Sequence, residues 1–195
     1  MMQDLNRQIR IKGAIYGIVL GVIILALNLI SYFIMVKLNT PKWVTAFSQP
    51  LFTNVLPIVA AALICFRLRK KIGGYWTLRQ ASSGIFAMFL TSYLIFFFGM
   101  LLYSKVIDPA MALNIENKIE SVKAAIRKDQ GVSQQHIDEE TKGLRKDFNE
   151  RENTSVLRSV QSFGIVIVLV FLASLIFAAL FKNDPPAYVA PNKKQ

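Results

Sequence analysis

The side chains that most often bind metals or act as nucleophiles are scarce in this chain of 195 residues. The single histidine, His136, lies beside Asp138, Glu139 and Glu140, and these groups could form a weak metal site. A solvated helix face explains the same pattern more simply. The single cysteine, Cys65, lies in an apolar segment, so the chain can form neither an internal disulfide nor a cysteine-based zinc site. We therefore predict that the protein binds no metal.

Catalysis by side chains needs a nucleophile with a base, paired carboxylates or a metal motif. The long apolar segments of this chain contain neither Asp nor His, and the H-E-x-x-H pattern of zinc proteases is absent. Gly73 and Gly74 follow no strand pattern and precede no G-K-[ST], so they do not form a phosphate-binding loop. We predict that the protein is not an enzyme and has no catalytic residue and no cofactor.

The hydrophobic residues, which make up 53% of the chain, gather in four segments that contain no charged side chain and no histidine. These segments are 13–36, 43–66, 81–104 and 160–181, and each is 22 to 24 residues long. A helix of about 20 residues crosses the hydrocarbon core of a bilayer, where every backbone group must be paired within the protein. The sequence therefore predicts an all-α integral membrane protein with a bundle of four spanning helices.

The formal net charge of +11 indicates how these helices are oriented. The tail 1–12, the connection 67–80 and the tail 182–195 carry nine of the eleven net charges, whereas 105–158 holds ten bases and ten acids. Cytoplasmic loops are enriched in Lys and Arg, while long loops translocate largely regardless of charge. We predict that both tails and 67–80 are cytoplasmic and that 107–159 lies outside. The positive charge then indicates no nucleic-acid partner, and 67–80 is too short to form a nucleic-acid reading element.

Three glycines, Gly13, Gly17 and Gly21, recur every four residues along one face of the first span. Small residues at this spacing let another helix backbone approach closely, which is how helices associate in lipid. The simpler interpretation is packing within the bundle. The alternative is homodimerisation or docking to another membrane protein.

The polar residues that the spans do contain include Asn28 and Asn54. Asn54 lies between Pro50 and Pro57, each of which removes a backbone donor and can break a helix. A broken helix could expose carbonyl groups to a solute, whereas the simpler interpretation is a kink whose freed carbonyls are capped by the Asn54 amide. We predict a short interfacial segment that bears Trp43 and Phe47, followed by a span that begins near Pro50.

Five basic residues with no acid among them lie between the second and third spans. They are Arg67, Arg69, Lys70, Lys71 and Arg79. Such a cluster can attract anionic lipid headgroups by about 1 kcal/mol per charge near the membrane surface. The simpler interpretation is a determinant of topology that binds no ligand.

The segment 107–159 is predicted to form a helical hairpin outside the membrane. Asp108-Pro109 ends the third span, and apolar residues then recur at spacings of three and four, which is typical of one helical face. A second helical pattern follows Gly131 and Ser133, which are typical of a helix stop and an N-cap. The chain is thus divided into a tail 1–12, spans 13–106, a hairpin 107–159, a span 160–181 and a flexible tail 182–195.

Short motifs around the third span resemble those of a known family. They are Phe66-Arg67, the run from Gly73 to Ala81 (GGYWTLRQA), Gly84, Ile107-Asp108-Pro109 and Gly131-Val132-Ser133. With these motifs and its four spans, nearly the whole chain resembles a family of small four-span bacterial membrane proteins classified as a domain of unknown function. The resemblance implies an inner-membrane location with the hairpin in the periplasm. It transfers no catalytic residue, because the family has no assigned activity.

The functional expectation combines the glycine face, the hairpin and the lack of ionisable groups at membrane depth, where proton-coupled transporters keep such groups. We expect an accessory or scaffold subunit of a bacterial envelope assembly, with membrane lipids and either another membrane protein or a second copy as partners. The alternative is a small permease or channel that uses the kinked second helix around Asn54.

Overall fold

The structure, a computed structural model, describes residues 2–38, 40–152 and 156–183, with the backbone alone at 2–4, 147–152 and 156–162. The described residues are mainly helical, and their only β-type pairing is an isolated bridge between Trp76 and Asn183. This confirms the all-α prediction. The predicted flexible tail lies outside the described residues from 184 onwards.

Seven α-helices and three π-helical turns follow one another in the described part of the chain. The α-helices are α1 (Met2–Tyr32), α2 (Lys42–Pro50), α3 (Leu56–Ile72), α4 (Leu78–Leu102), α5 (Met111–Asp129), α6 (Gln134–Glu152) and α7 (Val156–Phe181). The π-helical turns are Phe33–Lys37 after α1, Leu51–Val55 between α2 and α3, and Tyr103–Ile107 after α4. The helices α5 and α6 form the expected hairpin between the third and fourth spans.

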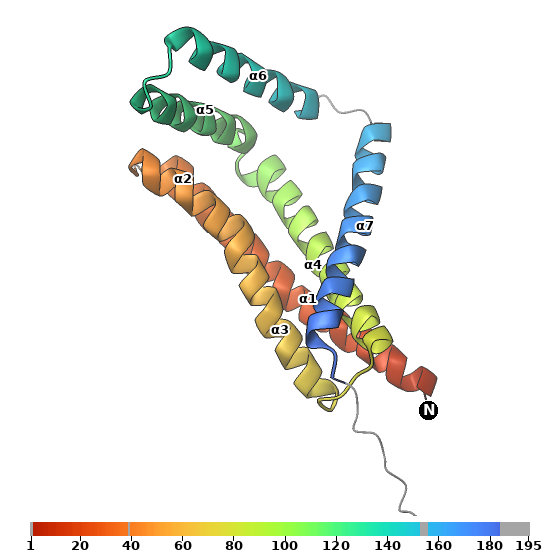
Figure 1. Ribbon diagram of the computed structural model, residues 1–195. Coiled ribbons are helices and arrows are strands. Elements are labelled where there is room, and N and C mark those ends of the chain that lie inside the picture. Colours follow the sequence, from red (N-terminus) through yellow and green to blue (C-terminus); the bar gives the residue numbers. More distant parts are fainter. Residues whose placement is uncertain (1, 39, 153–155, 184–195) are drawn as a thin grey trace, which may run out of the picture.

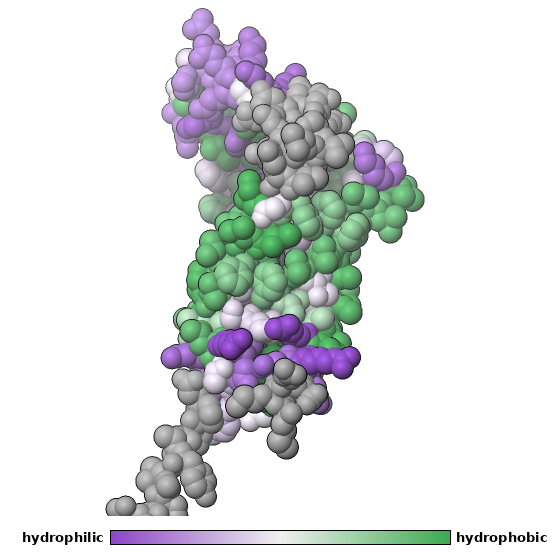
Figure 2. All heavy atoms as spheres, turned by 90° about the vertical axis from the view of Figure 1, so that its right-hand side faces the viewer, coloured by the Kyte–Doolittle hydropathy of each residue, from purple (hydrophilic) through white to green (hydrophobic). Residues whose placement is uncertain are grey.

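Within the described residues, four helical stretches are long and apolar enough to cross a membrane. They are Leu5–Lys37, Lys42–Ile72, Leu78–Ile107 and Phe163–Phe181. On the face that Figure 2 shows, an apolar belt lies between hydrophilic residues above and below it. The chain is therefore a multi-span membrane protein. We call the end that carries α5 and α6 the hairpin end, and the opposite end, formed by 5–12, 67–80 and 182–183, the basic end.

The spans are arranged around a parallel pair formed by α1 and α4, which lie side by side with Gly13 at the level of Gly84. The helix α3 packs on α1, and α7 packs on α4 through edge-to-face ring pairs such as Phe89–Phe177, whose centroids are 5.1 Å apart. The four spans meet toward the basic end. At the hairpin end α1 and α4 are still in contact, whereas α7 leans away from them, and α5 and α6 lie across this end (Figure 1).

The second span is one continuous helix, which differs from the predicted separation into an interfacial segment and a span. The helix runs for 31 residues from Lys42 to Ile72, with a π-helical turn between the two prolines. A π-helical turn widens the hydrogen-bond ladder, so the helix accommodates missing donors by bending and not by breaking. At about 46 Å, the helix exceeds the roughly 30 Å hydrocarbon core. Its first turns therefore reach the hairpin end, where α2 contacts α5.

The short connection between α3 and α4 closes the basic end of the bundle. Gly73 and Gly74 have φ values of 118° and 84°, in the left-handed region that favours glycine, and they turn the chain back. Trp76, which follows, is only 1% exposed, and its Nε1 donates to the carbonyl of Phe181 at 2.8 Å. The backbone of Trp76 also pairs with Asn183. The connection thereby holds the last residues of α7 against the start of α4.

We expect Trp76→Ala to lower the free energy of unfolding by about 3 kcal/mol, because it leaves a cavity and removes the bond to Phe181. The matched control is Tyr75→Ala, since the Tyr75 side chain is 53% exposed and its removal leaves no internal cavity. Unfolding midpoints in detergent would measure the difference. Equal midpoints for the two variants would contradict the role assigned to Trp76.

Candidate functional site

The glycine face of α1 is in contact with α4 of the same chain. A Cβ atom at Gly13 would collide with the carbonyl oxygen of Gly84, and one at Gly17 with the carbonyl oxygen of Met88. At Gly21, a Cβ atom would lie 2.7 Å from the Cβ of Ile95. All three positions need glycine because the backbones of the two helices approach too closely for any side chain. This face is therefore occupied within the protomer.

The contact is reciprocal, because α4 also presents glycines to α1. A Cβ at Gly84 would lie 2.7 Å from Cγ2 of Ile9, and one at Gly99 would lie 2.6 Å from Cδ2 of Leu25. Glycines of each helix thus pack closely against atoms of the other helix over most of the membrane thickness. Lipid removes the hydrophobic incentive for helices to associate, so close van der Waals packing of this kind stabilises the pair.

The two asparagines singled out in the sequence lie apart from each other. Asn28 is half-buried, and its Nδ2 donates to the carbonyl of Ile24 in its own helix at 2.9 Å. Asn54 is exposed, and its Nδ2 donates to Oγ1 of Thr53 at 3.3 Å and caps no backbone carbonyl. Neither asparagine lines the apolar crevice of about 220 Å³ between the spans, whose lining includes Leu20 and Tyr93.

The predicted basic cluster lies at the basic end but does not surround a single point. Arg69 and Lys70 lie over the ring of Phe66, at 4.6 Å and 5.3 Å from its centroid, and form cation–π contacts. Lys71 is on the same helix, α3, as is Arg67, whereas Arg79 lies in the first turn of α4. Figure 2 shows hydrophilic residues as a band below the apolar belt.

A polar cluster at the hairpin end is not apparent from the sequence pattern. The hydroxyl of Tyr32, at the end of α1, donates to Oδ2 of Asp108 at 2.5 Å, and Nζ of Lys37 lies 3.7 Å from the same oxygen. Asn114 of α5 donates to the Tyr32 hydroxyl at 3.5 Å, and Lys42 pairs with Asp129 at the far end of α5. These contacts fix α5 to the outer ends of the first two spans.

The signal for this cluster in the sequence is weak. Lys37 directly follows an apolar segment and Asp108 comes four residues after one, which is where charged residues commonly return the chain to water. Nothing in their sequence separation of 71 positions indicates that they meet. They meet because α1 and α4 are parallel and end at the same level.

Two arginine–carboxylate pairs hold the hairpin together. In one pair the arginine is on α5, and in the other it is on α6. Nε and Nη2 of Arg127 on α5 each lie 3.0 Å from a carboxylate oxygen of Glu140 on α6. Arg145 on α6 binds Glu120 on α5 in the same two-pronged way, at 3.1 Å and 3.0 Å. The bond to Glu120 raises the pKa of Arg145. Two-pronged pairs of this kind fix geometry as well as charge, so they set the relative position of α5 and α6.

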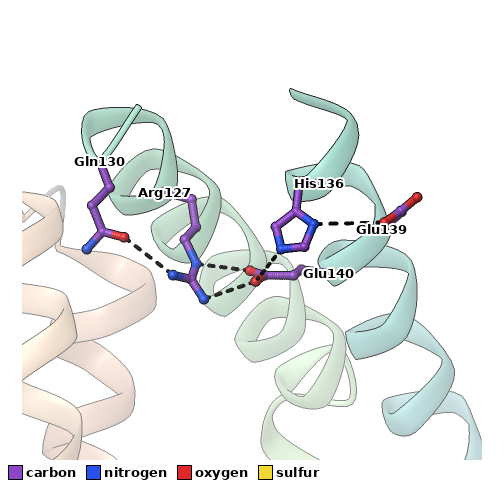
Figure 3. Close-up of polar contacts among 5 residues, drawn as sticks. All are labelled: Arg127, Gln130, His136, Glu139 and Glu140. Carbon is purple, nitrogen blue, oxygen red and sulfur yellow. Dashed lines mark hydrogen bonds and ion pairs between the residues drawn. The ribbon is translucent and has the colours of Figure 1, made fainter. Parts of the chain in front are cut away.

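His136 belongs to this charge network (Figure 3). Its Nε2 lies 3.7 Å from Glu140 and its Nδ1 lies 3.9 Å from Glu139. Since Glu140 already accepts two bonds from Arg127, the histidine shares its carboxylate with a permanent cation. The arrangement is that of a charge network between two helices.

The apolar face of α5 is directed toward the spans. A cavity of about 170 Å³ lies between this face and the outer ends of α1 and α2. Its lining includes Met35, Ala46, Ile119, Val122 and Ile126. The apolar stripe predicted from the sequence is therefore directed in part at the chain's own first and second spans.

The chain matches the sequence model of one known protein family. A family model matches residues 15–183, which is most of the chain, and it is described as "Protein of unknown function (DUF4199)". The chain belongs to the DUF4199 family. This confirms the resemblance inferred from the motifs. No curated protein and no solved structure matches the chain.

The motifs that resemble this family have identifiable structural roles here. The run from Gly73 to Ala81 forms the turn, the buried Trp76 and the capping box that starts α4, in which Thr77 and Gln80 bond each other's backbone N–H groups. Asp108 anchors α5 to α1, and Gly131, with φ of 75°, turns the chain between α5 and α6. The motifs specify the connections between helices.

We expect Gly17→Ala to lower the free energy of unfolding by about 1–3 kcal/mol, because the added methyl group must push α1 away from α4. The matched control is Gly164→Ala on α7, where an added Cβ would meet nothing within 4 Å. That substitution should be neutral or slightly stabilising. Unfolding midpoints of both variants in the same detergent measure this, and a Gly17→Ala variant as stable as the parent would refute the contact.

Proposed function

We propose that the protein is a non-enzymatic accessory or scaffold subunit of an assembly in the bacterial cell envelope, with the α5–α6 hairpin as its docking platform. The observation that carries this proposal is the way α5 is fixed to the spans. Tyr32 and Lys37 hold its first end through Asp108, and Lys42 holds its last residue, Asp129. A platform held at both ends can present side chains to a partner without the entropic cost of ordering a loose segment.

The outer surface of α6 has the chemistry of a docking surface. Glu140 and Arg145 are engaged by α5, whereas Glu139, Lys142 and Lys146 are exposed. Charges of both signs on a fixed helix favour recognition of a partner of complementary pattern, since electrostatic complementarity confers specificity. Burial of the glycine face within the protomer also directs docking away from α1.

The proposed location is the bacterial inner membrane, with both tails and the basic end in the cytoplasm and the hairpin in the periplasm. The support is the distribution of charge, because nine of the eleven net charges lie in the segments at the basic end and the two tails. The hairpin segment 105–158, which is neutral overall, is compatible with translocation.

The alternative of a permease or channel has less support. The alternative depends on Asn54, which is exposed on the outer surface of the second span, and whose side chain bonds its neighbour Thr53 and no other residue that the structure describes. The crevice between the spans is lined almost wholly by apolar side chains, which offer an ion or sugar few groups to replace its water.

The test is co-purification of the full-length protein from native membranes in mild detergent, with a paired charge exchange on α6. Glu139→Lys combined with Lys142→Glu keeps the net charge and leaves the Arg127–Glu140 and Arg145–Glu120 pairs intact. We expect the parent to retain a stoichiometric partner and the exchanged variant to lose most of it. Arg67→Gln, at the opposite end of the bundle, is the control and should retain the partner.

Two results would contradict the proposal. One is a parent protein that purifies as a monomer, with no co-purifying protein, from several mild detergents, because a docking platform requires a partner. Solute flux in liposomes that is lost on Asn54→Leu would favour the permease alternative.

A further inference from the structure

One side chain at the basic end crosses from α1 to α4. Nε of Arg10 donates to Oγ of Ser83 at 2.8 Å, directly below the contact between Gly13 and Gly84. The glycine contact brings the two helices together, so an arginine on one can reach a hydroxyl on the other. The bond fixes the guanidinium in place while both residues stay accessible to solvent.

The fixed guanidinium keeps most of its donors available. Only Nε of Arg10 makes a contact with a described side chain, so the terminal Nη groups can still donate. Arg79 lies one turn before Ser83 on the same face of α4 and is exposed. Each of the two helices thus carries an exposed arginine at this bond or within one helical turn of it. Neither arginine pairs with an acid among the side chains that the structure describes.

The bonded pair of Arg10 and Ser83 lies at the boundary between water and the apolar belt. Arg10 precedes by three residues the charge-free segment that begins at Gly13, so its side chain is at the depth of lipid headgroups. One turn deeper, α1 carries Ala14 and α4 carries Ala87, both half-buried. The side chains one turn deeper are therefore small and apolar, as expected where the acyl chains begin.

We propose that Arg10, Ser83 and Arg79 bind the phosphate of an anionic phospholipid in the adjoining membrane leaflet. Guanidinium groups bind phosphate oxygens in pairs, and the bond to Ser83 holds Arg10 ready to do so. A free phosphate ion offers the same oxygens but no acyl chain, so only a lipid is held by the membrane at the depth of Arg10. The cations of α3 differ, because Arg69 and Lys70 lie over Phe66 and no hydroxyl of a second helix positions them.

The experiment is native mass spectrometry of the full-length protein released from nanodiscs that contain phosphatidylglycerol and phosphatidylcholine. We expect the parent to retain phosphatidylglycerol, and Arg10→Gln to reduce that retention about tenfold, the effect of losing charge-assisted hydrogen bonds. The matched control is Arg67→Gln, an exposed arginine of α3 with the same loss of charge. It should change retention less than about twofold, as expected for a screened surface charge.

Further variants distinguish a binding site of defined geometry from a general attraction of anionic lipid to positive charge. Arg10→Lys keeps the charge but loses the paired donors, so it should fall between the parent and Arg10→Gln. Ser83→Ala, which removes no charge, should also weaken retention, and this variant keeps the test valid if Arg10→Gln proves unstable. Equal losses for Arg10→Gln and Arg67→Gln would overturn the proposal, because diffuse attraction depends only on net charge.

The source of the phosphate is decided by competition. Inorganic phosphate and glycerol 3-phosphate are added in excess to the protein before release from the nanodisc. Continued retention of phosphatidylglycerol supports a lipid site that depends on the acyl chain. Displacement of the lipid by inorganic phosphate would overturn the lipid assignment in favour of a free-anion site.

Discussion

The close approach of α1 and α4 is the contact on which the rest of the bundle depends. Gly13 and Gly17 admit the backbone of α4, and Gly84 and Gly99 admit side chains of α1. In lipid, where apolar side chains gain nothing by meeting each other, this density of van der Waals contact replaces the hydrophobic effect. The other two spans each pack on one member of the pair. Because the pair is parallel, its two helices also reach the hairpin end together, where Tyr32 meets Asp108.

The two ends of the molecule have different constructions, and this separates their proposed roles. At the basic end, the short turn with the buried Trp76 draws α3, α4 and α7 together, and Arg79 on α4 is exposed beside it. At the hairpin end, α7 leans away from the α1–α4 pair, and α5 and α6 lie across the spans (Figure 1). Contact with lipid phosphate is proposed for the first end and contact with a protein partner for the second.

Much of the fold was predictable from local patterns in the sequence. The four charge-free segments have the length of a membrane crossing, and the membrane leaves helices as the only open-ended way to pair the backbone. The start of the second helix was not predictable, because a π-helical turn between Pro50 and Pro57 lets the helix continue from Lys42. Of the residues proposed to bind lipid phosphate, only Arg79 was in a pattern that the sequence made visible. Arg10 and Ser83 are 73 positions apart and become a pair only through helix packing.

The sequence by itself determined the membrane class, the number of spans, the hairpin and the uneven distribution of charge, because each depends on composition and spacing within one segment. The tertiary structure alone decided which helix fills the glycine face, which carboxylate binds each arginine of the hairpin, and which end of the bundle closes. These depend on contacts between segments far apart in the chain. A glycine repeat allows close approach by any helix, and only the packing of the whole bundle selects α4 as the one that approaches.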